Sequence, residues 1–294
     1  MKSKKAESNQ PLVYELINLE GRLRAQMRPD YLCPTCEGRG FLFFEDERGI
    51  SSMKECECTG LKKRLRLLNE ANIPGKFADT KLETYHPVHP SQRLALRIAQ
   101  DFVSDFADRI QGLVFMGKPG LGKTHLAIGI LKSLILDYGV ECKFVDFFQL
   151  LSDIRHGYSN DLSEQAIINP YVHARVLVID ELAKGRNTEW EHTMLDQIIS
   201  HRYNAADRVT LFTTNYTDTD SDAGPAPGPE RIDPVSRSYA ERMTGGSLKE
   251  RLGERIYSRL SEMCRFVKLE GEDYRPNIVV REGTRRKSPA RKFN

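Results

Sequence analysis

The sequence predicts an α/β protein in which a parallel sheet is covered by helices. Two observations lead to this fold class. Between residues 91 and 280, short apolar runs alternate with longer amphipathic segments, which is the pattern of repeated strand–helix units. A glycine-rich sequence at 117–124 stands directly after one apolar run and directly before one amphipathic segment. A phosphate-binding loop takes this position between a strand and a helix.

Five apolar runs are the expected strands, namely Leu113–Met116, Cys142–Phe147, Val176–Asp180, Val209–Thr213 and Phe266–Leu269. The amphipathic segment from Thr124 to Tyr138 is an expected helix, and Gly139 after it is a common helix stop. A second helix is expected to open at Ser247, because Glu250 stands three residues later and the two form a capping box.

The composition is that of a globular protein that does not enter a membrane. Charged residues make up 29% of the chain and hydrophobic residues 39%, and no apolar run reaches the roughly 18 residues of a membrane span. Glu15, Asn18 and Glu20 interrupt any apolar region of a signal peptide. We therefore expect a cytoplasmic protein. The net charge of +3 conceals a basic tail at 281–294, which suits contact with a polyanion or simply keeps a chain end solvated.

Changes in composition divide the chain into four parts, which are a partner-binding region with a cysteine cluster at 1–75, a linker at 76–90, a nucleotide-binding domain at 91–280 and the basic tail at 281–294. In the first part, Leu12–Arg24 has leucines at helical spacing and Leu61–Glu70 is a basic helical stretch. His86–Pro90 is rich in proline and is the expected linker, and Thr217–Glu230 has the composition of a mobile surface loop.

The glycine-rich sequence predicts a triphosphate site. It matches the pattern G-x-x-x-x-G-K-[ST] and consists of Gly117, Lys118, Pro119, Gly120, Leu121, Gly122, Lys123 and Thr124, followed by His125. Glycines let successive backbone N–H groups point inward and, with the helix N-terminus, hold phosphates. We expect Lys123 to reach the β- and γ-phosphates of a bound triphosphate and Thr124 to bind Mg²⁺. The alternative is a glycine-rich turn without a ligand.

Two further strand ends complete the predicted site. Asp180 and Glu181 follow a buried strand, so Asp180 is expected beside the magnesium ion and Glu181 is expected to polarise the attacking water. The next strand ends in Thr213, Thr214 and Asn215, and Asn215 would face the γ-phosphate. The alternative for Asn215 is a residue that initiates a turn.

Four of the six cysteines predict a structural zinc site. Cys33 and Cys36 form one pair and Cys56 and Cys58 the other, and four thiolates complete a tetrahedral shell around Zn²⁺. The segments Phe41–Glu45 and Met53–Glu55 would form a hairpin between the pairs. Unrelated core cysteines and a redox pair are the alternatives. The other two cysteines, Cys142 and Cys264, are expected to be buried small hydrophobic residues.

Several motifs together resemble the DnaC/DnaI-type helicase loaders and the related IstB-type transposition ATPases of the AAA+ superfamily. They are GKPGLGKTHLA, VLVIDEL, HRYN before a strand that ends TTN, and ERIYSRLSEMC with GEDYR. The resemblance covers about residues 70–278, and the cysteine segment from Cys33 to Cys58 resembles the cluster that some of these loaders carry.

This resemblance implies a sheet with strand order 5-1-4-3-2, ATP hydrolysis and ATP-dependent self-assembly into an oligomer. By position, Asn215 resembles sensor 1, Arg259 the arginine finger and Arg275 the sensor 2 arginine. Arg255 lies four residues before Arg259 on the same helix face and is the alternative finger. The sequence departs from the family pattern in Glu181, where the loaders often have a second aspartate, and in the long connection at Thr217–Glu230.

The resulting hypothesis is a loader that grips a replicative helicase through residues 1–75 and delivers it to single-stranded DNA. Candidate DNA contacts are Lys62, Lys63, Arg64, Arg66, Arg202, Tyr203 and the basic tail. Three alternatives stay open: a transposition regulator that recruits a transposase, a small-molecule P-loop kinase, and a zinc adaptor whose nucleotide site is vestigial.

Overall fold

Five parallel strands form the central sheet, in the order β6-β7-β8-β5-β9. Their bounds are Gly112–Met116 for β5, Cys142–Asp146 for β6, Val176–Asp180 for β7, Val209–Thr214 for β8 and Cys264–Lys268 for β9. Numbered along the chain, this is the order 5-1-4-3-2 that the family resemblance implies, so the predicted fold class is confirmed. The structure is a computed structural model that describes residues 13–45, 49–108, 110–161, 163–205, 207–217 and 246–274.

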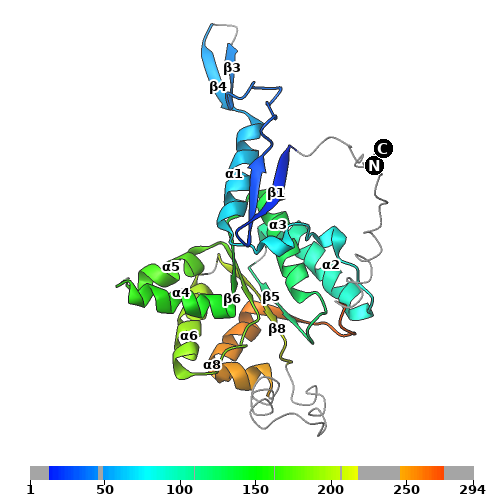
Figure 1. Cartoon of the computed structure of the whole chain (residues 1–294), viewed down its shortest axis with the longest axis vertical. Coiled ribbons are helices and arrows are strands. Elements are labelled where there is room, and N and C mark those ends of the chain that lie inside the picture. Colours follow the sequence, from blue (N-terminus) through cyan, green and yellow to red (C-terminus); the bar gives the residue numbers. More distant parts are fainter. Residues whose placement is uncertain are drawn as a thin grey trace, which may run out of the picture.

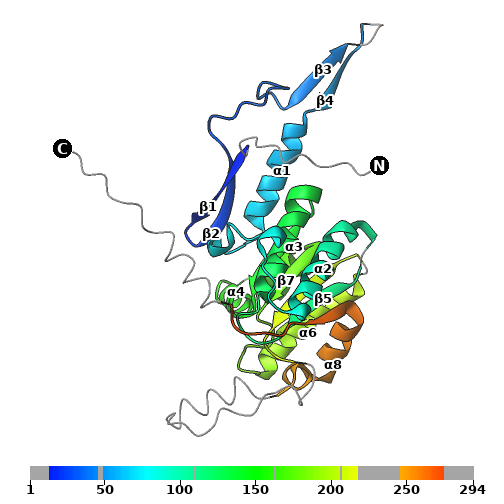
Figure 2. The same ribbon diagram turned by 90° about the vertical axis from the view of Figure 1, so that its right-hand side faces the viewer.

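Helices cover both faces of this sheet (Figures 1 and 2). One hydrophobic cluster joins one face to α1 (Glu57–Glu70), α2 (Pro90–Ser104) and α3 (Lys123–Tyr138). A second cluster joins the other face to α4 (Phe147–Ser159), α5 (Glu164–His173), α6 (Glu189–Asn204) and α8 (Leu248–Met263). Within β5, Leu113 lies in the first cluster and Val114 in the second, because side chains of a strand alternate between its faces.

Most predicted boundaries agree with the structure to within two residues. Helix α3 ends at Tyr138, and Gly139 follows with φ 69°. The capping box at Ser247 is confirmed, since its N–H donates to Glu250 Oε2 at 2.9 Å and its Oγ accepts the Glu250 N–H at 3.3 Å. Phe147 was expected in a strand but begins α4, because Asp146 Oδ1 accepts the first free N–H groups of that helix.

The helix predicted at Leu12–Arg24 is wrong. The described part of this segment forms an antiparallel hairpin of β1 (Tyr14–Leu19) and β2 (Arg22–Met27). Glu20 and Gly21 make the two-residue turn with φ 50° and 78°, the left-handed geometry that tight hairpins require. The leucine spacing fits a helix by coincidence: Leu23 is buried and Leu19 is 53% exposed.

A second hairpin stands apart from the sheet. It consists of β3 (Phe41–Glu45) and β4 (Ser51–Glu55). The predicted hairpin is confirmed, with its second strand starting two residues before the predicted Met53. Figures 1 and 2 show it at the far end of α1, which connects it to the rest of the molecule. Residues Leu65 and Leu68 of α1 share a hydrophobic cluster with α3 and the sheet. Two short 3-10 helices follow α1, η1 (Gly75–Phe77) and η2 (Leu82–Thr84).

The segment predicted as a linker, 76–90, contains η2 and runs into α2 at its end. Pro90 is the first residue of α2 and His89 is its N-cap, a position at which proline is favoured because its missing N–H is not needed. A third 3-10 helix, η3 (Phe106–Asp108), separates α2 from β5. The division of the chain into four parts stays a prediction.

Two predicted segments lie outside the described residues, namely the basic tail at 281–294 and all of the Thr217–Glu230 loop except Thr217. The chain on either side of residues 218–245 comes together, since the N–H of Leu248 donates to the Thr217 carbonyl at 2.8 Å. Among the described residues, no helix is long and apolar enough to cross a membrane.

Candidate nucleotide-binding site

The glycine-rich loop lies between β5 and α3, at the carboxyl end of the sheet, where parallel α/β sheets bind ligands. Its glycines are needed for both backbone angle and space. Gly120 and Gly122 have φ of 82° and 83°, and a Cβ on them would lie 1.9 Å from Asp273 Oδ1 and 2.4 Å from Tyr85 Cε2, respectively. No other residue type fits these two positions without displacing its neighbours.

Lys123 is buried at the base of this loop. Its Nζ donates to the carbonyls of Gly117 and Lys118, both at 2.7 Å. These contacts fold the ammonium back over the start of the loop, and the same loop leads into the N-terminus of α3. A cation and a helix N-terminus at one place favour a bound anion such as a phosphate.

Three oxygen-bearing side chains meet where β7 ends. Asp180 Oδ1 accepts a hydrogen bond from Thr124 Oγ1 at 2.8 Å and another from Thr213 Oγ1 at 2.5 Å. Burial raises the pKa of Asp180, while the two hydroxyl donors act in the opposite direction. A threonine hydroxyl beside a carboxylate is the donor set that Mg²⁺ prefers in phosphate sites. The residues predicted to hold magnesium, Thr124 and Asp180, are thus in contact and fit the ion.

Glu181 follows Asp180 but leaves the strand. Its φ is 56°, its N–H donates to Thr213 Oγ1 at 3.0 Å, and its Oε2 accepts from Lys184 Nζ at 2.5 Å. Asn215 is exposed directly after β8, the strand that lies between β5 and β7. The site thus brings a second carboxylate and an amide to the same edge of the sheet as the phosphate loop.

The two candidate finger arginines share one partner on α6. Arg259 Nη1 lies 2.5 Å from Asp196 Oδ1, and Arg255 Nη2 lies 3.5 Å from Asp196 Oδ2. Arg255 is much the more exposed of the two, with 73% of its side chain accessible against 23% for Arg259. The third predicted arginine, Arg275, lies outside the described residues, but the N–H of Tyr274 before it donates to the Gly120 carbonyl at 3.2 Å.

Residues before α2 also line the phosphate loop. The hydroxyl of Tyr85 donates to the Leu121 carbonyl at 2.8 Å. His125 Nε2 lies 2.8 Å from the Lys81 carbonyl, its ring is 5.3 Å from that of Tyr85, and burial lowers its pKa. The side chain of His125 therefore contacts the segment before α2, while its backbone belongs to the first turn of α3.

The four predicted zinc ligands lie together. The Sγ atoms of Cys33, Cys36, Cys56 and Cys58 are all within 4.8 Å of one another, and all four side chains are buried. The Cys33 Sγ lies 3.7 Å from that of Cys56, and the Cys36 Sγ lies 3.5 Å from that of Cys58. Four thiols at this spacing fit a tetrahedral Zn²⁺. Cys142 and Cys264 are buried elsewhere, as predicted.

One predicted DNA contact is wrong. Arg202 is 1% exposed and donates to Thr210 Oγ1 and to the backbone carbonyls of Tyr171, Val172, Ala174 and Val209. A guanidinium enclosed by carbonyls at the end of α5 stabilises the fold and does not face solvent. Its neighbour Tyr203 is 37% exposed. On α1, Lys62, Lys63 and Arg66 are exposed and Arg64 is partly buried.

A family model described as "IstB-like ATP binding protein" matches residues 58–222, which is more than half of the 294-residue chain. The chain belongs to this family. The matched range contains the phosphate loop, Asp180 and Glu181. The resemblance to the DnaC/DnaI helicase loaders of the AAA+ class is confirmed as well.

Among curated proteins, the chain is 28% identical over 194 residues to the replicative helicase loader DnaC of Escherichia coli K12, covering 65% of this chain and 78% of that protein. It is 25% identical over 214 residues to the uncharacterized protein YqaM of Bacillus subtilis, covering 68% of this chain and 67% of that protein. The crystal structure of the DnaC helicase loader matches with a TM-score of 0.52 and 29% identity, covering 66% of this chain and 99% of that one. The crystal structure of DnaI matches with a TM-score of 0.50 and 19% identity, covering 68% of this chain and 93% of that one. This match supports the fold alone.

Three residues that hold the site were not singled out from the sequence. Thr213 lies in the same Thr-Thr-Asn strand end as Asn215, so its hydroxyl could have been predicted at the site. Asp196 and Lys184 gave no signal, because acidic and basic residues on an exposed helix or loop usually face solvent. Their roles depend on contacts made only in the folded chain.

Proposed function

We propose that this protein hydrolyses ATP and uses the reaction to load a replicative helicase onto single-stranded DNA. The observation that carries the proposal is the contact of Thr124 with Asp180 at the phosphate loop, with a second carboxylate, Glu181, directly beyond it. Binding a nucleotide with magnesium requires the first two residues. Glu181 adds a group able to polarise a water molecule, which hydrolysis requires.

When bound, the magnesium ion supplies positive charge that offsets the phosphates, and Thr124 and Asp180 would hold it. Lys123 binds the β- and γ-phosphates, and Asn215 orients the attacking water. Arg275 is the proposed sensor of the γ-phosphate. The roles of Thr124, Asp180, Lys123 and Asn215 are supported by their positions at one edge of the sheet. The role of Arg275 rests on the family pattern alone.

Self-assembly is part of the proposal. Arg259 lies on α8, where it pairs with Asp196 of α6. By the family pattern, we assign it to the ATP site of a neighbouring subunit in an ATP-dependent oligomer. Arg255 is the alternative finger. An arginine supplied by a neighbouring subunit makes ATP hydrolysis depend on assembly. A loader needs hydrolysis to be coupled to assembly in this way.

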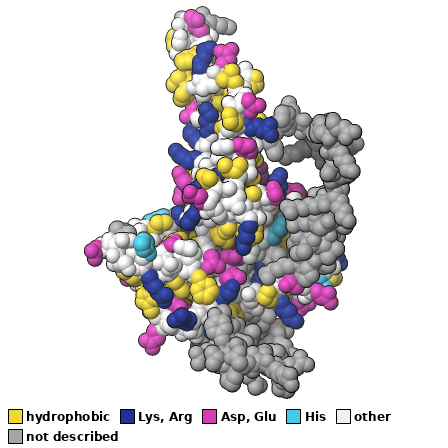
Figure 3. Space-filling model, in the orientation of Figure 1, with side chains coloured by type: hydrophobic (Ala, Val, Ile, Leu, Met, Phe, Trp, Pro, Cys, Tyr) yellow, Lys and Arg dark blue, Asp and Glu magenta, His cyan; other side chains and the backbone are white. Residues whose placement is uncertain are grey.

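The helicase is proposed to bind the N-terminal part, residues 1–75. Here the β3–β4 hairpin presents apolar side chains to solvent, since Phe43, Phe44 and Met53 are 66%, 51% and 60% exposed. Figure 3 shows hydrophobic side chains gathered at this end of the molecule. A Zn²⁺ ion on the four cysteines would keep the hairpin in shape, and exposed apolar side chains are typical of protein interaction sites.

A second candidate function is regulation of transposition, with a transposase as the partner. The family model favours it, because the description it carries is that of an IstB-like protein. In both cases we place the protein in the cytoplasm and expect single-stranded or duplex DNA as a ligand.

Affinity purification of the full chain from its host distinguishes these functions. The Glu181→Gln variant is used as bait in the presence of ATP and Mg²⁺, because slow hydrolysis preserves the ATP-bound assembly. Recovery of the replicative helicase, followed by ATP-dependent transfer of that helicase to single-stranded DNA in vitro, is the expected result. Recovery of a transposase without helicase would favour the second function, and the Lys123→Ala variant is the matched control without ATP binding.

A further inference from the structure

The loop between β7 and α6 carries Glu181 and has an unusual backbone. Glu181, Ala183 and Asn187 have φ of 56°, 67° and 64°. Residues other than glycine rarely take the left-handed conformation, and three within seven positions persist only where neighbouring groups hold them. The position of Glu181 therefore depends on the contacts that fix this loop.

The two ends of the loop are fixed by β8 and α6. At the first end, Thr213 Oγ1 accepts the Glu181 N–H, and the Thr213 carbonyl accepts the Leu182 N–H at 2.7 Å. At the other end, Glu191 Oε2 accepts the Asn187 N–H at 2.8 Å. The middle of the loop, from Ala183 to Gly185, lies between these two anchors.

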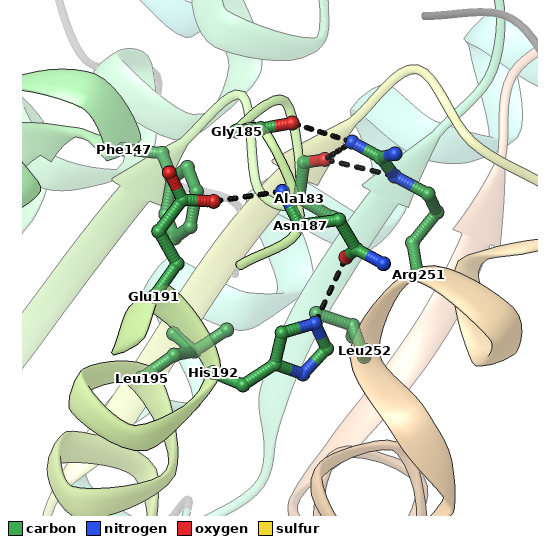
Figure 4. A pocket seen from close by; sticks show the side chains of 9 residues that line it. All are labelled: Phe147, Ala183, Gly185, Asn187, Glu191, His192, Leu195, Arg251 and Leu252. Atoms are coloured by element: carbon green, nitrogen blue, oxygen red, sulfur yellow. Dashed lines mark hydrogen bonds between the residues drawn. The ribbon is translucent and has the colours of Figure 1, made fainter. Parts of the chain in front are cut away.

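Arg251 of α8 holds this middle part. Its Nε and Nη2 donate to the Ala183 carbonyl at 3.3 and 2.9 Å, and Nη2 also donates to the Gly185 carbonyl at 2.6 Å. Figure 4 shows the guanidinium reaching from α8 to both carbonyls. The guanidinium also lies against the Tyr216 ring, 5.1 Å from its centroid. A planar fork of donors suits two carbonyls at once, whereas a lysine ammonium offers no such geometry.

A kink separates Arg251 from the candidate finger arginines. Gly253 has φ 75° and ψ 158° and interrupts α8. Arg251 precedes it, while Arg255 and Arg259 follow it and contact Asp196 of α6. The first turn of α8 thus supports the Glu181 loop, and the part after the kink carries the finger.

We propose that Arg251 is a positioning residue for Glu181 within the same subunit. It does not contact the nucleotide; it holds the carbonyls of Ala183 and Gly185 so that the loop keeps Glu181 at the edge of the sheet. The inference rests on the proposed ATPase function and names the residue that orders its catalytic loop.

The first test separates catalysis from binding. Arg251→Met removes the donors but keeps a long apolar side chain, and Arg251→Lys keeps the charge without the fork. For Arg251→Met we expect an ATP Kd within about twofold of the parent and a kcat lower by on the order of 10²-fold, the effect of a misplaced catalytic group. Arg251→Lys should recover part of kcat. Lys249→Met is the control, because Lys249 is on the same turn and pairs with exposed Glu254.

The second test asks whether Arg251 acts on its own site or through the finger. Arg251→Met protein has a poor pocket and an intact Arg259, so mixing it with Arg259→Ala protein should restore activity. Mixing it with Lys123→Ala protein, whose pocket is also inactive, should restore none. In the opposite result, Arg251→Met regains activity when mixed with Lys123→Ala protein but not when mixed with Arg259→Ala protein. That result would show that Arg251 acts through the finger and would overturn the proposal.

Two other results bear on the proposal. In one of them, ATP affinity falls in both Arg251 variants by the same factor as kcat/KM. Arg251 would then only maintain the nucleotide pocket, and the proposal would be overturned. If a mixture of Lys123→Ala and Arg259→Ala proteins regains no activity, the proposed ATP site shared between two subunits is wrong. A lower kcat at unchanged Kd in Arg251→Met would still support the role of Arg251. If Arg251→Met does not fold, Arg251→Lys gives the same split between kcat and Kd.

Discussion

The hydroxyl of Thr213 links the two acidic residues of the nucleotide site: it donates to Asp180 Oδ1 at 2.5 Å and accepts the Glu181 N–H at 3.0 Å. Thr213 is 1% exposed, so neither contact can be replaced freely by water. A single side chain of β8 therefore sets the orientation of the carboxylate proposed for magnesium and of the backbone that carries the proposed base.

Thr213→Val keeps the shape of this side chain and removes its hydroxyl. We expect a loss of about 1–3 kcal/mol in the free energy of unfolding, because the buried carboxylate of Asp180 and the partly buried N–H of Glu181 each lose a partner. Thr213→Ser, which keeps the hydroxyl, should lose much less. Urea unfolding measures both values, and equal losses in the two variants would contradict the role of the hydroxyl.

Lys123→Ala and Glu181→Gln should affect the nucleotide in different ways. Lys123→Ala removes the ammonium that neutralises the phosphates, so ATP binding and turnover should both be lost. Glu181→Gln should bind ATP as the parent does and hydrolyse it slowly, because the amide cannot polarise water as a base. Equilibrium binding of a fluorescent ATP analogue and a phosphate-release assay distinguish them. Unchanged turnover in Lys123→Ala, or lost binding in Glu181→Gln, would contradict these assignments.

The cysteine cluster should hold metal. We expect about one zinc per chain in purified protein, since four thiolates make one closed site, and chelation should loosen residues 33–58 while ATP binding is kept. Cys56→Ser should lose the zinc. Cys142→Ala is the control, because Cys142 is buried outside the cluster. Elemental analysis and hydrogen exchange measure these effects, and a metal-free protein with full protection of 33–58 would argue against the site.

Because Lys132 is buried, we expect a particular pH dependence of the free energy of unfolding. This buried lysine of α3 donates to the carbonyls of Phe77 and Ala78, at 3.3 and 2.6 Å, and burial lowers its pKa to about 8, with nearby Lys81 adding to the effect. An unfolded lysine has a pKa of about 10.4. Between these two values the unfolded chain binds more protons than the folded one, so the contribution of Lys132 to stability rises with pH in this window.

The comparison with Lys132→Met isolates this effect. The unfolding free energy of the parent minus that of the variant should increase from pH 8 to pH 10 and should be constant from pH 6 to pH 7. Lys62→Met, which changes an exposed lysine of α1, serves as the control. A difference that does not change with pH would show that burial of Lys132 does not shift its titration.

The core of the site could be predicted because it depends on local order along the chain. A strand, a glycine loop and a helix must follow one another, and the carboxyl ends of parallel strands meet at one edge, so Thr124 and Asp180 were expected together. Arg251 and Ala183 could not be paired in this way, because 68 positions separate them. Arg202 was misjudged because its sequence context does not show that four backbone carbonyls surround it. The hairpin at Tyr14–Met27 was missed because leucine spacing was given more weight than the turn at Glu20 and Gly21.

The finger prediction separates an assembling ATPase from a self-contained one. Arg259→Ala should bind ATP normally and hydrolyse it on the order of 10³-fold more slowly, the loss expected for an arginine that stabilises the transition state. Arg255→Ala is the comparison from the same helix, because Arg255 is the alternative finger and also contacts Asp196.

Mixing Arg259→Ala with Lys123→Ala should restore part of the activity, because some interfaces then combine an intact pocket with an intact finger. Single-stranded DNA should increase this rescue if it brings subunits together. The phosphate-release rate of the mixture is compared with the sum of the two separate rates over a range of protein concentrations. A mixture that never exceeds that sum, together with full loss of activity in Arg255→Ala, would transfer the finger role to Arg255. If both arginine variants hydrolyse ATP at the parent rate, the site is complete within one subunit and the assembly model is wrong.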